Sequence, residues 1–271
     1  MNEQPIILID DPATIADYEI MDLQIDVLDE PLCFQIGVKD RPVRLSDMVP
    51  AARSLLDKLI EIVTKNLEES GQTISCHKGC HYCCYYIVPV LPSEAFRIRD
   101  EILTMDSNQR EQVLLNILNA IKCIKEYNIS ELVFDKITNG QDPVELLDSL
   151  SDWYKKLGFG CPFIIDKVCS IYEQRPLICR ELLTLSPPDT CKVEASVTSQ
   201  PVTLPISIAK ALKVAADKME NTTTGIILLA LLIPWCEENG QRYGKTFPAK
   251  DIVESFFEEI KTNLIVHSSK S

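Results

Sequence analysis

The sequence predicts a mainly α fold: a helical body with cysteine-rich loops and a small N-terminal β-hairpin. Three observations lead to this prediction. Apolar residues recur at helical spacing in several long segments, short apolar runs alternate with polar residues near the N-terminus, and cysteines gather in two turn-rich stretches. With 271 residues, 46% of them hydrophobic, the chain is long enough to bury a substantial core.

The N-terminal residues 1–45 are predicted to form an acidic β element, followed by a helical cysteine-cluster domain at residues 46–265. Asp29-Glu30-Pro31 is typical of a turn between two apolar runs, so residues 18–38 are expected to form the hairpin. The two cysteine segments, residues 76–84 and 161–191, fall inside the predicted helical domain.

The net charge of −13 is concentrated at the N-terminus, where residues 1–30 carry nine acidic side chains and no Lys or Arg precedes Lys39. Such an arm repels phosphate backbones and anionic membrane surfaces, so we expect no nucleic-acid partner and no membrane binding. The acidic arm remains a candidate site for binding a protein partner. The first residues lack the basic and apolar stretches of an export signal, and the apolar run Gly225–Cys236 is too short to cross a bilayer. A cytoplasmic location is therefore predicted.

Helices are expected from apolar periodicity and from capping residues. A first helix should span residues 46–70, because Gly71 stands where a C-terminal cap belongs. Another should begin at Asp142-Pro143, since Asp favours the N-cap and Pro the first turn, and end at Gly158. The other expected helices span about residues 93–104 with Ser93 as cap, 108–126, 205–219, 222–239 (which would bury the apolar run) and 249–263.

The first cysteine segment has the spacing of a metal site. Cys76, Cys80 and Cys83 form a C-x3-C-x2-C pattern, and Gly79 gives the turn its backbone freedom. Zinc and iron–sulfur clusters need thiolates that tight turns bring together. A reducing compartment keeps thiols free or metal-bound, and eleven cysteines, an odd number, do not suit a closed disulfide framework.

The second segment is expected to be a small knuckle followed by a helix. Cys161 opens a turn, Asp166-Lys167 turns the chain back toward Cys169, and Arg175-Pro176 begins the helix that carries Cys179. Cys191 completes a set of eight, which suits two four-thiolate sites or one larger cluster. The predicted metal ligands are Cys76, Cys80, Cys83, Cys84, Cys161, Cys169, Cys179 and Cys191.

Two features refine this prediction. The adjacent thiols of Cys83 and Cys84 point apart, so as ligands they would serve two metals or two sides of one cluster. Eight thiolates also need positive charge nearby, for which Arg175, Arg180, Lys78 and Lys167 are candidates. His77 and His81 could replace a thiolate, although a place beside the ligands is the commoner arrangement. The remaining cysteines, Cys33, Cys123 and Cys236, are expected to be core thiols.

The pattern C-x3-C-x2-C-C followed by C-P-F…C-S-I-Y-E-x-R-P-x-x-C-R resembles the YkgJ-type CxxCxxCC cysteine-cluster family. That family is described as a zinc- or iron-chelating domain with eight cysteines, and the resemblance covers about residues 70–195. It implies that zinc or an iron–sulfur cluster is the cofactor. A similar domain is associated with flagellin lysine methylases, so the resemblance also implies that such sites can serve enzymes.

Several functions remain open at this point. A structural or metal-chaperone module and a cluster-dependent enzyme, acting in redox chemistry or in S-adenosylmethionine-dependent modification such as protein lysine methylation, explain the residues equally well. Cys76, Cys80, Tyr82 and Cys83 also fit the C-x3-C-x-aromatic-C pattern of radical S-adenosylmethionine enzymes, but helices rather than a strand–helix barrel are expected to follow. A redox thiol pair at Cys83-Cys84 would need a strained disulfide. The sequence identifies neither a catalytic residue, nor the substrate, nor the oligomeric state.

Overall fold

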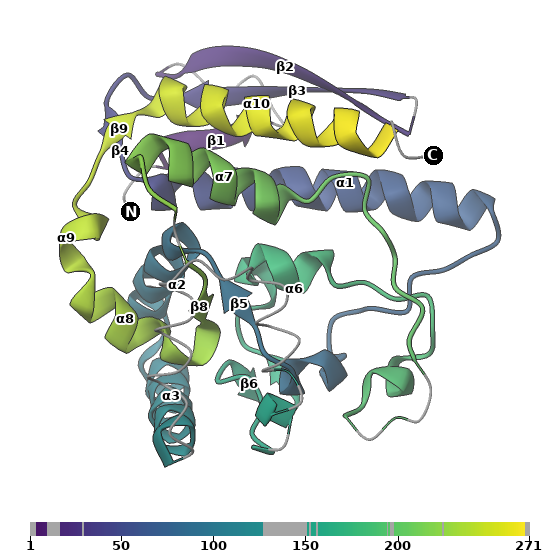
Figure 1. The fold of residues 1–271 in the computed structure, drawn as a ribbon, viewed down its shortest axis with the longest axis vertical. Coiled ribbons are helices and arrows are strands. Elements are labelled where there is room, and N and C mark those ends of the chain that lie inside the picture. Colours follow the sequence, from purple (N-terminus) through teal and green to yellow (C-terminus); the bar gives the residue numbers. More distant parts are fainter. Residues whose placement is uncertain are drawn as a thin grey trace. The chain divides into compact units, whose positions relative to one another are not determined.

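The computed structural model describes residues 4–9, 17–28, 30–126, 151, 153–155, 157–193, 195, 198–223 and 225–268. Its fold is mainly α with small antiparallel strands at the N-terminus, so the predicted fold class is confirmed (Figure 1). The chain divides into two compact units. Unit 1 comprises Met1–Asn66, Thr203–Thr224 and Gln241–Ser271, and unit 2 comprises Leu67–Val202 and Gly225–Gly240. The division expected from the sequence, residues 1–45 and 46–265, stays a prediction.

Unit 1 contains a three-stranded antiparallel sheet. It is built from β1 (Ile6–Ile9), β2 (Glu19–Val27) and β3 (Glu30–Val38) in the order β1-β3-β2. β2 and β3 form the predicted hairpin, and β1 adds a third strand along β3. Cys33 is exposed, so the prediction of a core thiol there was wrong. Side chains alternate along a strand, and the flanking Phe34 and Ile36 take the buried face of β3.

Helices α1 (Val49–Glu69), α7 (Ile208–Glu220) and α10 (Ala249–Ser268) complete unit 1. Figure 1 shows α10 running along the sheet and beside α7, and Phe34 of β3 packs on Phe257 of α10 with ring centroids 5.1 Å apart. The short helix η2 (Leu45–Met48) precedes α1, and β4 (Pro42–Val43) pairs with β9 (Phe247–Pro248). Gly71 has a φ of +73°, the left-handed conformation expected of a C-terminal cap.

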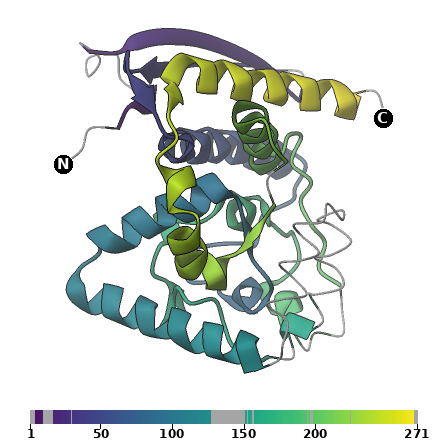
Figure 2. The same ribbon diagram turned by 60° about the vertical axis from the view of Figure 1, so that its left-hand side comes forward.

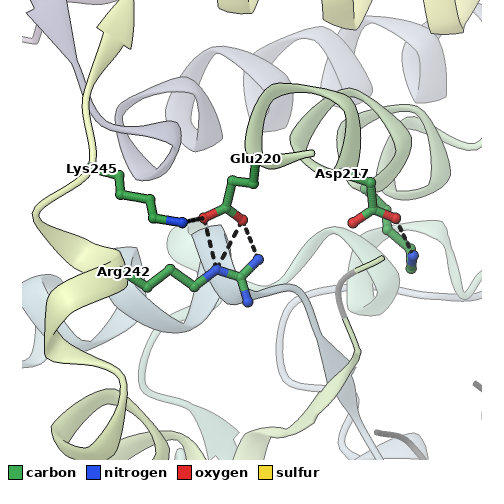
Figure 3. Close-up of polar contacts among 5 residues, drawn as sticks. Asp217, Glu220, Arg242 and Lys245 are labelled. Atoms are coloured by element: carbon green, nitrogen blue, oxygen red, sulfur yellow. Dashed lines mark hydrogen bonds and ion pairs between the residues drawn. The ribbon is translucent and has the colours of Figure 1, made fainter. Parts of the chain in front are cut away.

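A buried carboxylate ends α7 in unit 1. Figure 3 shows Glu220 held by Arg242, of α9 (Gly240–Tyr243), and by Lys245. The Arg242 Nε donates to both carboxylate oxygens at 2.9 Å, and the Lys245 Nζ lies 3.9 Å from Glu220 Oε1. A negative charge at a helix C-terminus is unfavourable by itself, so these cations offset both the helix dipole and the burial of Glu220.

Unit 2 contains a helical hairpin of α2 (Pro92–Thr104) and α3 (Ser107–Glu126), visible as two neighbouring helices in Figure 2. α8 (Leu232–Glu238) packs on α2, where Trp235 and Phe96 have ring centroids 5.1 Å apart. The predicted cap of α2 was wrong by two residues. Leu91 is the N-cap, and the carboxylate of Glu94 accepts its N–H at 3.2 Å, which leaves Ser93 inside the first turn.

The apolar run Gly225–Cys236 is only partly helical, so the predicted helix over residues 222–239 was wrong in its first half. β8 (Ile227–Leu228) pairs with β5 (Pro89–Val90), η6 (Leu229–Leu231) follows, and the helix starts at Leu232. Pairing with a strand far away in the sequence overrides the local helical preference. Cys236, at the end of the run, is 1% exposed, as predicted for a core thiol.

The helix start predicted at Asp142-Pro143 lies outside the described residues. The predicted end is described: residues 153–155 are helical and Gly158 has a φ of +70°, as predicted for a terminal glycine. Within the described part of the chain, no helix combines the length and the apolar character that crossing a bilayer requires.

Candidate metal centre

The first cysteine segment is a chain of tight turns in unit 2. Gly79 has a φ of +97°, which confirms the turn predicted there, and the Cys80 N–H donates to His77 O at 3.1 Å. The 3-10 helix η3 (Tyr82–Tyr85) then carries Cys83 and Cys84. Ser75 attaches the start of the segment to the second one, since its N–H donates to Thr184 O at 2.9 Å.

The second segment has the predicted knuckle. β6 (Ile164–Ile165) pairs with β7 (Val168–Cys169), and Asp166 and Lys167 form the turn with φ values of 51° and 64°. Phe163, which is fully buried, anchors the knuckle. The helix α6 (Leu177–Glu181) follows Pro176 and presents Cys179 in its first turn, as expected.

Backbone hydrogen bonds join the two segments. The Cys161 N–H donates to Cys84 O at 2.7 Å, which places the start of the knuckle directly against η3. η5 (Pro188–Cys191) also contacts η3, and the hydroxyl of Tyr86 donates to Lys192 O at 3.5 Å. The fold thus brings Cys191 to the same place as the cysteines of both segments.

The cysteines surround two neighbouring cavities in unit 2. The outer cavity, of about 530 Å³, is lined by four of the predicted ligands: Cys76, Cys80, Cys83 and Cys191. The inner cavity, of about 80 Å³, is lined by six: Cys80, Cys83, Cys84, Cys161, Cys169 and Cys179. Cys80 and Cys83 line both, and all eight predicted cysteines line at least one. Cys33, Cys123 and Cys236 line neither.

Burial makes ionisation of most of these thiols costly. It raises the pKa of Cys161 from 9.0 to about 12 and that of Cys179 well above 9.0. The pKa values of Cys76, Cys169 and Cys191 are also raised, first by burial and then by the neighbouring thiols. A group of thiols that repel one another as thiolates needs a cation before all of them can lose their protons.

Cys83 is the exception, because its pKa is lowered rather than raised. The hydrogen bond from Cys84 lowers the pKa of Cys83 to about 7, and Arg175 acts in the same direction. The same hydrogen bond raises the pKa of Cys84. Because the thiolate is the form that binds metals, Cys83 is available as a ligand near neutral pH.

The four cations predicted to balance the thiolates have different roles. Arg175 lowers the pKa of both Cys83 and Cys169, as expected of a compensating charge. Arg180 is 4% exposed and donates to the backbone oxygens of Glu173 and Arg175, so it fixes the loop before α6. Lys78 forms an exposed ion pair with Glu173 at 3.0 Å. Lys167 lies in the exposed turn of the knuckle.

Glu94 is a structural residue next to the site that the sequence analysis missed. It is 1% exposed, and its Oε1 accepts the Leu177 N–H at 2.7 Å while its Oε2 accepts the Leu91 N–H. One carboxylate therefore holds the start of α2 and the start of α6, two residues before Cys179. Its position three residues after Leu91 is the spacing of a capping box, which the sequence shows. The hydrogen bond to α6 cannot be predicted from the residues around Glu94, because Leu177 is far away in the sequence.

The donor set fits a thiophilic metal. Zinc and iron both accept thiolates as ligands, and one thiol is poised to ionise. Among the described residues, no three His, Cys, Asp or Glu side chains already converge on one metal position. The imidazoles are not added to this set, since His77 is exposed with its Nδ1 2.9 Å from Ser75 O, and His81 packs on the Tyr82 ring.

A comparison with protein-family models finds a match over part of the chain. Residues 75–195 match the CxxCxxCC family. Its description reads "Putative zinc- or iron-chelating domain". The CxxCxxCC match covers slightly less than half of the chain and contains all eight predicted ligands, so the resemblance expected from the motifs is confirmed. Neither the curated proteins nor the solved structures contain a match.

Proposed function

We propose that this chain is a metal-binding protein whose eight cysteines hold zinc or an iron–sulfur cluster. One observation carries the proposal: all eight predicted ligands line two adjoining cavities that share Cys80 and Cys83. The family match of residues 75–195 supports the choice of zinc or iron. Bound zinc would neutralise thiolates without redox change, whereas an iron–sulfur cluster would also supply electron transfer.

The two cavities suggest two different roles. At about 80 Å³ the inner cavity has the volume of two or three water molecules, so it suits ions rather than an organic ligand. A metal there would tie η3, the knuckle and α6 together and stabilise the folded state. The outer cysteines face a much larger cavity, where a bound metal would remain accessible to a small molecule. This size favours a cluster-dependent enzyme as the second candidate function.

Metal analysis of protein purified without oxygen tests the proposal. We expect either about two zinc ions per chain, or iron together with labile sulfide and an absorption band at about 400 nm. Cys80→Ser and Cys83→Ser should lower the metal content most, because both cysteines line both cavities. Cys191→Ser should affect the outer group and Cys179→Ser the inner group.

Cys123→Ser is the matched control, since Cys123 is half-buried and lines neither cavity. Its metal content should equal that of the unmodified protein. Protein that binds neither metal after anaerobic reconstitution would refute the proposal. So would a Cys123→Ser variant that loses as much metal as Cys83→Ser.

A further inference from the structure

Two amide side chains of α3 bind the backbone of the knuckle. The Asn116 Nδ2 donates to Pro162 O at 3.0 Å, and the Gln109 Nε2 donates to Ser170 O at 2.9 Å. Gln109 and Asn116 lie about two helical turns apart on α3, so they share one face of the helix. This face of α3 therefore holds the knuckle at both of its ends.

The peptide unit between Pro162 and Phe163 links Asn116 to a cysteine sulfur. Its C=O, from Pro162, accepts the hydrogen bond from Asn116, and its N–H, from Phe163, hydrogen-bonds the Cys161 sulfur. That N–H lowers the pKa of Cys161, against the larger effect of burial. Because a peptide unit is planar and rigid, a bond at its C=O end fixes the direction of its N–H. Asn116 thus orients the N–H that the Cys161 sulfur accepts.

Cys169 has the same arrangement through the peptide unit between Ser170 and Ile171. The Ser170 C=O accepts the hydrogen bond from Gln109. The Ile171 N–H hydrogen-bonds the Cys169 sulfur and lowers its pKa, again against burial. A hydrogen bond at the C=O also polarises the peptide unit and makes its N–H a stronger donor. α3 thus reaches two predicted ligands through two equivalent chains of hydrogen bonds.

A third side chain of α3 sets the orientation of the Asn116 amide. The Gln112 Nε2 donates to Asn116 Oδ1 at 3.1 Å, which directs the Asn116 Nδ2 at the knuckle. The same Nδ2 lies 3.4 Å from the backbone oxygen of Ile164, in β6. The Asn116 amide therefore has its acceptor end on its own helix and its donor end on the knuckle.

We propose that Asn116 and Gln109 are positioning residues of the metal centre. Each directs one backbone N–H at the sulfur of one knuckle cysteine, Asn116 for Cys161 and Gln109 for Cys169. An N–H beside a thiolate favours the charged form, and hydrogen bonds to ligand sulfurs orient them and tune the metal. The hydrogen bonds belong to the chain alone, whereas their effect on a bound metal rests on the function proposed above.

Amide hydrogen exchange, resolved by residue with NMR, tests the pairing in the full chain, both metal-free and reconstituted with zinc. Asn116→Leu removes the donor and keeps nearly the same side-chain shape. The Phe163 N–H should then exchange at least about threefold faster, the effect of losing roughly one hydrogen bond, while the Ile171 N–H keeps its rate. Gln109→Met should give the reverse pattern.

Gln112→Met is a milder version of the same test. Gln112 is exposed, and its loss should accelerate exchange at Phe163 less than Asn116→Leu does, because it acts through the Asn116 amide. It also keeps the test decisive if Asn116→Leu does not fold. Asn119→Leu is the matched control, since Asn119 is exposed on α3, and it should leave the exchange rates of both N–H groups unchanged.

Metal binding supplies the second measurement. Asn116→Leu and Gln109→Met should each weaken zinc binding, measured by chelator competition, by about tenfold, as is typical when a partner of a metal ligand is removed. With an iron–sulfur cluster, both variants should shift the reduction potential to a more negative value, because an N–H beside a sulfur favours the more negative, reduced state. Asn119→Leu should change neither quantity.

Three results would overturn the inference: unchanged exchange at Phe163 and Ile171, equal acceleration of both in each variant, or metal affinity equal to that of the unmodified protein. Equal acceleration would mean that α3 only supports the fold of the knuckle. Paired changes in exchange in protein that binds neither zinc nor iron would refute only the proposed function. Bound metal with unchanged exchange would refute only this inference.

Discussion

The Cys161 N–H donates to the backbone oxygen of Cys84 at 2.7 Å. This hydrogen bond joins two segments that are far apart in the sequence, at the residue where each contributes a thiol to the inner cavity. Backbone hydrogen bonds position the chain more firmly than flexible side chains do, because fewer torsions separate the bonded groups from the main chain. The contact therefore helps to hold the inner cysteines near one another.

Arg175 should add to the reactivity of Cys83, after the larger effect of the hydrogen bond from Cys84. Arg175→Gln removes a charge that lowers the pKa of Cys83, so this pKa should rise from about 7. In metal-free, reduced protein the rate of Cys83 alkylation should then increase with pH at a higher midpoint, as peptide mass spectrometry can measure. Lys167→Gln, in the exposed turn of the knuckle, is the control and should leave the midpoint unchanged. An unchanged or lower midpoint in Arg175→Gln would contradict the assignment.

Cys236 should make stability depend on pH outside the metal centre. Burial raises the pKa of this thiol from 9.0 to about 12 in the folded state. The folded protein thus holds the proton more tightly than the unfolded chain, so the stabilisation is complete below about pH 9 and is lost as the pH rises toward 12. The difference in unfolding free energy between the unmodified protein and Cys236→Ala should shrink over this range.

Denaturant unfolding at several pH values measures that difference. A difference that stays constant or grows would refute the prediction. Alkylation supplies a check at pH 8, where the exposed Cys33 should react and the buried Cys236 should not.

Removing Arg242 should cost more than removing Lys245. Arg242→Met leaves Glu220, whose side chain is 2% exposed, without its main partner, and breaking such a buried pair costs about 3 kcal/mol. Lys245→Met should cost less than about 1 kcal/mol, because that lysine side chain is 54% exposed. Urea unfolding of both variants compares the two losses, and equal losses would show that Glu220 does not depend on Arg242.

Glu94 should support both α6 and the metal centre. Glu94→Ala leaves the Leu91 and Leu177 N–H groups without their acceptor, which should cost about 3 kcal/mol of stability. It should also weaken metal binding, since α6 carries Cys179. Glu111→Ala, at an exposed position of α3, is the control and should change stability by less than about 0.5 kcal/mol. Glu94→Ala protein with unchanged stability and metal affinity would exclude this role.

Local patterns predicted several elements because nearby residues decide them. The left-handed glycines Gly71 and Gly158 end helices as expected, and Asp166-Lys167 turns the knuckle. Predictions failed where distant residues decide the outcome. Ile227 and Leu228 pair with β5 instead of continuing a helix. Cys33 faces outward because its neighbours on β3 take the buried side of the sheet.

For the candidate site, the sequence by itself determined which cysteines are the predicted ligands, since their short spacings and turn residues are local properties. Only the tertiary structure decided how they are grouped. Backbone contacts between distant segments place Cys80 and Cys83 on both cavities and Cys191 on the outer one. Burial and neighbouring groups then separate the pKa of Cys83 from those of the other thiols. Both depend on packing in three dimensions, which no spacing along the chain encodes.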